Sequence, residues 1–97
     1  MHQKSQAQFT RVEPAFWWIG FNNPEVEVLF YHKELNLSNF QPKVQSESVV
    51  IKRITRTENP RYVFLNLEIL PTAKPGIVPV LFSDGKKILS YQYELKS

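Results

Sequence analysis

The sequence contains no cysteine, and this absence removes two kinds of site at once. A disulfide framework and a cysteine-based metal site are both excluded, and the redox compartment cannot be inferred. The two histidines, His2 and His32, lie far apart in the sequence, so a metal centre built on them is not expected either. The three glycines stand singly at Gly20, Gly76 and Gly85, which excludes a glycine-rich phosphate loop. We therefore expect neither a metal nor any other cofactor.

Long hydrophobic runs are also missing. No apolar stretch approaches the roughly 18 residues that a membrane-spanning helix needs. Residues 1–10 (MHQKSQAQFT) are polar and lack the apolar centre of a signal peptide. We expect no membrane partner, and the pattern fits either a cytoplasmic protein or a bacterial periplasmic one whose signal peptide was removed.

The carboxylates are not arranged as a catalytic pair. Glycosidic hydrolysis needs two spaced acids in one cleft. Here the acids are mostly Glu25, Glu27, Glu68 and Glu94, on stretches that we interpret as solvated strand faces, whereas Asp84 falls in a predicted turn. No histidine is placed to activate a nearby serine. We therefore expect that this chain alone is not an enzyme.

Basic and acidic residues are mixed along the chain, with 12 Lys and Arg against 9 Asp and Glu and a net charge of +3. Such a balance supports solubility and says little about partners. One cluster, Lys52, Arg53, Arg56 and Arg61 near Tyr62, combines basic and aromatic residues as nucleic-acid-binding surfaces do. We favour a solvated strand end for this cluster and expect no nucleic-acid partner.

The chain of 97 residues, 42% of them hydrophobic, has the size and composition of one globular domain. We predict a disordered or tag-like lead over residues 1–8 and a single domain over residues 9–97. Short stretches alternate apolar and polar residues with the period of two that marks strands. The clearest is residues 62–69 (YVFLNLEI), where Val63, Leu65 and Leu67 are expected to face the core.

Other stretches extend the strand pattern. Residues 76–82 and 87–96 flank an Asp-Gly turn and should pair antiparallel, with Pro79 requiring an edge or a bulge. In residues 48–55 (SVVIKRIT), Val50 and Ile54 are predicted to share one face with Lys52. Residues 32–40 lack a clean period and are interpreted as a loop or short strand, followed by a breaker at Pro42. Strands recurring in this way without a helical stretch predict an all-β sandwich of about seven strands.

Residues 11–21 (RVEPAFWWIGF) hold two adjacent tryptophans, and neighbours on an extended strand point to opposite faces. We predict a first strand before Pro14, after which the chain crosses the sandwich edge. One tryptophan should face the core. The other, which we take to be Trp18 rather than Trp17, should share a surface patch with Phe16 or Phe21. Docking on a partner domain is the favoured use of that patch, and sugar stacking or partial burial without a partner are the alternatives.

Five short motifs occur in a fixed order: V-E-P before W-W-x-G, N-P-x-Y before an alternating stretch, A-K-P-G, and a terminal Y-E-L-K. Together, over residues 11–96, they resemble the N-terminal domain of cyclomaltodextrinases and neopullulanases, enzymes of the α-amylase superfamily. Two positions depart from the family pattern. Phe21 stands where methionine is usual, and His32 stands where glycine is frequent, so a positive φ is not expected at His32.

The resemblance implies an immunoglobulin-like antiparallel β-sandwich that precedes a (β/α)-barrel cleaving α-1,4 and sometimes α-1,6 glucosidic bonds. The catalytic carboxylates belong to that barrel. This chain would be an accessory domain that docks on the barrel of its parent chain, with a homodimer and a weak α-glucan contact as further expected partners. Two other hypotheses stand beside it: an independent carbohydrate-binding module for starch-type oligosaccharides, and a generic immunoglobulin-like interaction domain. The residues expected at an interface or sugar contact are Trp18, Trp17, Phe16 and Phe21.

Overall fold

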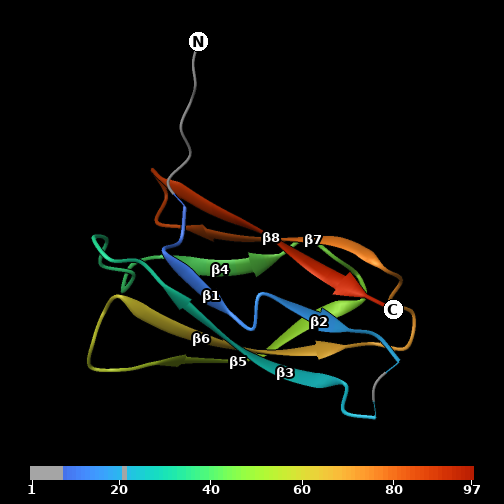
Figure 1. Cartoon of the computed structure of the whole chain (residues 1–97). Coiled ribbons are helices and arrows are strands. Elements are labelled where there is room, and N and C mark those ends of the chain that lie inside the picture. Colours follow the sequence, from blue (N-terminus) through green and yellow to red (C-terminus); the bar gives the residue numbers. More distant parts are fainter. Residues whose placement is uncertain (1–7, 21) are drawn as a thin grey trace.

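The computed structural model describes residues 8–20 and 22–97, and this part of the chain is all-β. Its strands form two four-stranded sheets, with the orders β1-β3-β6-β5 and β2-β8-β7-β4, which we call the first and the second sheet (Figure 1). The strands are β1 (Arg11–Glu13), β2 (Phe16–Trp18), β3 (Glu25–Tyr31), β4 (Gln41–Val44), β5 (Val49–Arg56), β6 (Tyr62–Ile69), β7 (Gly76–Ser83) and β8 (Ile88–Lys96). The predicted all-β sandwich is confirmed.

The described part of the chain has eight strands rather than the roughly seven predicted. The reason is that the first strand of an immunoglobulin-like sandwich is divided here into β1 and β2, which belong to different sheets. Strand β1 pairs antiparallel with β3, whereas β2 pairs parallel with β8. The chain changes sheets at Pro14, whose ring nitrogen has no hydrogen to donate to a continuing ladder. The remaining strands follow the order of a constant-type immunoglobulin domain. The break that the sequence places at Pro14 is therefore the point of the crossing.

The core lies between the inner faces of the sheets. Val63, Leu65 and Leu67 of the central strand β6 are fully buried, as predicted. Phe30 and Phe82 join the two sheets, with ring centroids 5.0 Å apart. Other buried side chains come from both sheets and from the segment after β3: Val12, Val26, Val28, Leu37, Phe40, Val49, Ile69, Val78, Val80, Leu89, Tyr93 and Leu95.

Strand β5 contains a bulge that the alternating pattern did not predict. The register with β6 shifts at Lys52, so one residue is added without a counterpart. Beyond it, Ile54 pairs with Leu65. Opposed residues of an antiparallel pair share a face, so Ile54 lies on the inner face of the sheet, unlike Val50, although on this edge strand it remains 41% exposed. The prediction that Val50 and Ile54 share a face is wrong because the extra residue reverses the alternation.

Two prolines lie within strands. Pro42, predicted as a breaker, belongs to β4, which the sequence pattern missed and which forms an edge of the second sheet. Pro79 lies in β7, an inner strand whose register with β8 is unbroken, so neither the predicted edge position nor the predicted bulge is found. However, β4 pairs only with residues 80–83 of β7, and Pro79 follows just beyond this ladder. There the carbonyl oxygen of Pro79 still accepts the N–H of Gln45 at 3.0 Å, and the missing N–H of Pro79 removes no bond from the paired residues of β4 and β7.

The hydroxyl of Tyr93 gives a first testable prediction. Tyr93 is 1% exposed, burial raises the pKa of its hydroxyl, and this hydroxyl has no hydrogen-bond partner among the described residues. Burying a polar group without a partner costs about 1–3 kcal/mol. We expect Tyr93→Phe to raise the free energy of unfolding by about 1 kcal/mol, measured by urea denaturation.

The matched control for Tyr93→Phe lies two residues earlier on the same strand. The hydroxyl of Tyr91 donates to the carbonyl oxygen of Ala15 at 3.1 Å. Tyr91→Phe removes this bond and should lower the stability by about 1 kcal/mol. If both substitutions destabilise the domain equally, the hydroxyl of Tyr93 is satisfied in solution and the prediction is wrong.

Candidate functional site

The site begins with strand β2, because its parallel pairing with β8 decides which way the tryptophans point. Trp17 lies opposite the buried Leu95 and packs against the core. Trp18 lies opposite Lys96 and is 38% exposed, and Phe16 on the same face is 36% exposed. The structure therefore places Trp17 inward and Trp18 outward, the orientation that we predicted for the pair.

The outward residues form a cluster that we call the aromatic patch, made of Phe16, Trp18, Ile77 and Lys96. The rings of Phe16 and Trp18 meet edge to face with centroids 5.7 Å apart. The ammonium of Lys96 lies 4.1 Å from the centroid of the Phe16 ring, a cation–π distance. Ile77, 53% exposed, lies on the same face, with Glu94 of β8 between it and Phe16, because both residues pair with Glu94.

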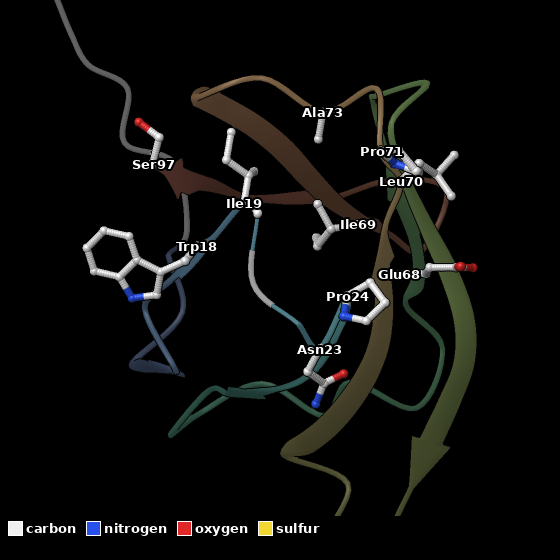
Figure 2. A pocket seen from close by; sticks show the side chains of 11 residues that line it. Trp18, Ile19, Asn23, Pro24, Glu68, Ile69, Leu70, Pro71, Ala73 and Ser97 are labelled. Carbon is white, nitrogen blue, oxygen red and sulfur yellow. The ribbon is translucent and has the colours of Figure 1, made fainter.

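Trp18 also forms one wall of a hollow at the end of the sandwich (Figure 2). The hollow has a volume of about 720 Å³ and is lined by apolar residues, among them Ile19, Pro24 and Ile69, together with the polar Asn23, Glu68 and Ser97. The carboxylate of Glu68 points away from Trp18 in Figure 2. The aromatic patch and this hollow therefore share Trp18.

The four residues predicted for an interface or sugar contact are not equivalent. Phe16 and Trp18 lie together on the surface, whereas Trp17 contributes to the core side of the same strand. Phe21 lies outside the described residues, as does nearly all of the predicted lead over residues 1–8. Sequence reasoning missed Ile77 and Lys96, because their place beside Phe16 depends on the pairing of β8 with both β2 and β7.

Two cations of the basic cluster, Lys52 and Arg56, make contacts within the domain. Lys52 is paired with Glu25 at 3.0 Å. The Arg56 guanidinium is directed to backbone carbonyls of Leu37 and Phe40. The side chains of Lys52 and Arg56 therefore bind groups of the domain itself. For these two residues, this fits our interpretation of the cluster as a strand end.

Asp84 caps the turn between β7 and β8, where its Oδ1 accepts the N–H groups of Lys86 and Lys87 at 2.9 and 2.7 Å. These hydrogen bonds lower the pKa of Asp84. In residues 8–20 and 22–97, no group of three or more His, Cys, Asp or Glu side chains could hold a metal ion. Within the same part of the chain, no helix is long and apolar enough to cross a membrane.

The fold and the surface together define an immunoglobulin-like β-sandwich domain that presents an aromatic patch on its second sheet. A comparison with protein families identifies it further: the model of the family described as "Cyclomaltodextrinase, N-terminal" matches residues 11–97. The chain belongs to this family of cyclomaltodextrinase N-terminal domains. The match spans all five motifs on which the resemblance rests, and the predicted family is confirmed.

Proposed function

We propose that this chain is the non-catalytic accessory domain of an α-glucan-degrading glycoside hydrolase and docks on the catalytic barrel of its parent chain. The observation that carries the proposal is the aromatic patch, in which Phe16, Trp18 and Ile77 are each more than a third exposed. Soluble domains seldom leave such a cluster uncovered without a use. Membership of the cyclomaltodextrinase family supplies the enzyme context.

The chemistry of the patch suits a protein contact. Aromatic residues are enriched in the cores of interfaces, and a few central anchors supply most of the binding energy. Trp18 has the position of such an anchor, between the patch and an apolar hollow that can receive a side chain from a partner. The ammonium of Lys96 lies over the Phe16 ring and adds a positive charge to the aromatic patch. The same surface could take part in a homodimer of the parent enzyme.

A second candidate function is binding of a starch-type oligosaccharide on Trp18. The exposed indole favours it, because aromatic faces stack on the apolar C–H faces of glucose. Titration of the chain with maltooligosaccharide or cyclodextrin, followed by tryptophan fluorescence, separates the two functions. A saturable change that Trp18→Ala abolishes would support sugar binding, whereas an unchanged spectrum favours docking. A generic immunoglobulin-like interaction domain is the least favoured reading because it leaves the family match unexplained.

The accessory role predicts that the chain hydrolyses nothing by itself. Cleavage of a glycosidic bond requires an acid and a base or nucleophile on opposite sides of the bond. Incubation with cyclodextrin, pullulan and soluble starch should therefore release no reducing sugar above a buffer blank. Activity that persisted through repurification and disappeared in a carboxylate variant, such as Glu94→Gln, would overturn this prediction.

A further inference from the structure

His32 directly follows β3 and is one of two buried polar residues in the described part of the chain, with 8% of its surface exposed. Its backbone N–H donates to the carbonyl oxygen of Arg61 at 3.1 Å, which fixes it to the start of β6. It also begins the segment of residues 32–40, which has no strand of its own yet supplies Leu37 and Phe40 to the core. His32 is therefore positioned to control how this segment closes over the sandwich.

The imidazole ring of His32 holds the first half of that segment. Its Nδ1 accepts the backbone N–H groups of Glu34 and Leu35 at 3.1 and 3.0 Å. A ring nitrogen that accepts hydrogen bonds carries no proton, so the ring is neutral with its hydrogen on Nε2. Protonation turns Nδ1 into a donor that faces two other donors. Both hydrogen bonds must then break.

Arg56 holds the second half of the segment in a different way. Its guanidinium donates to the carbonyl oxygen of Leu37 at 2.8 Å and to that of Phe40 at 2.6 Å. The N–H of Leu37 donates in turn to the carbonyl oxygen of Pro60 at 2.7 Å. Arginine keeps its charge throughout the physiological range. The anchoring of residues 37–40 therefore does not depend on pH, in contrast to that of residues 34 and 35.

The surroundings of the ring favour its neutral form. Burial lowers the pKa of His32, and the charges of Lys33 and of Lys87, in the turn after β7, act in the same direction, whereas Glu34 opposes them. The native pKa thus lies below the unfolded value of about 6.5. The stability that His32 contributes is complete above about pH 6.5 and is lost as the pH falls through the native pKa.

We propose that His32 is a pH-sensitive latch, whose protonation releases residues 33–35 while Arg56 keeps Leu37 and Phe40 in the core. The release also reaches the segment before β1, because the N–H of Lys33 donates to the hydroxyl of Thr10 at 2.9 Å. Mild acid therefore loosens one corner of the sandwich without unfolding it. This inference concerns the fold of the chain and is independent of the docking proposal.

The test is amide hydrogen exchange by NMR on the 97-residue chain between pH 8 and pH 5. After correction for intrinsic exchange, the protection of Glu34 and Leu35 should fall on acidification. The expected total loss of protection is about tenfold for each unit by which the fold lowers the pKa of His32. The amide of Leu37 should keep its protection over the same range. Equal behaviour of all three amides would overturn the proposal.

The matched variant is His32→Asn, whose Oδ1 occupies the position of Nδ1 and accepts hydrogen bonds without titrating. In this variant, the protection of the Glu34 and Leu35 amides against hydrogen exchange should be independent of pH. A pH dependence like that of the parent chain would overturn the proposal. A second measurement needs no variant: the ring nitrogen shifts of His32 at pH 8 should report a proton on Nε2. A proton on Nδ1 would contradict the latch whether or not the variant folds.

Discussion

Leu65→Ala is expected to lower the free energy of unfolding by about 2–5 kcal/mol, the range for truncating a fully buried leucine. Leu65 is completely buried on β6, between Val28 of β3 and Ile54 of β5. Its neighbours on both sides are held by ladders, so the structure has little freedom to collapse into the cavity. Chemical denaturation followed by tryptophan fluorescence provides the measurement.

Ile88→Ala is the control for Leu65→Ala. Ile88 begins β8 and is 57% exposed, so its truncation creates no cavity. The change in unfolding free energy should stay within about 0.5 kcal/mol. If the two substitutions had equal and small effects, residue 65 would not be in the core and the assigned faces of β6 would be reversed.

Trp18→Ala is expected to leave the melting temperature of the isolated domain nearly unchanged and to weaken its docking on the catalytic barrel. Truncation of a central aromatic anchor typically costs about 2 kcal/mol or more, which corresponds to about a 30-fold loss of affinity. Calorimetric titration of the domain into the separately produced barrel measures this loss. In the whole parent enzyme, the oligomeric state by size-exclusion chromatography gives a second readout.

Trp17→Ala separates the role of the patch from that of the core. Trp17 packs against the core from the same strand, so its truncation should destabilise the isolated domain by up to about 3 kcal/mol. If Trp18→Ala instead unfolds the domain, the assignment of the two tryptophans is reversed. If neither substitution changes docking, oligomeric state or sugar binding, the pair is structural and the interface lies elsewhere.

The position of the candidate site was only partly predictable from the sequence. The alternation of Phe16, Trp17 and Trp18 along an extended strand indicated that one tryptophan would face outward. It could not show that Lys96 covers Phe16 or that Ile77 completes the patch, because these contacts join residues about 60 to 80 positions apart in the sequence. The role of His32 was also missed, since an imidazole that accepts two backbone N–H groups has no sequence signature.

The sequence by itself determined the features that depend on neighbouring residues. These are the strand character of residues 62–69 with its inward face, the hairpin around Asp84, and the break at Pro14, each of which follows from side-chain alternation or from the backbone of a turn residue. The tertiary structure alone decided the bulge at Lys52, the parallel pairing of β2 with β8 and the burial of Leu37 and Phe40. The physical reason is that register and loop burial are set by contacts between distant segments, whose energies outweigh local preference.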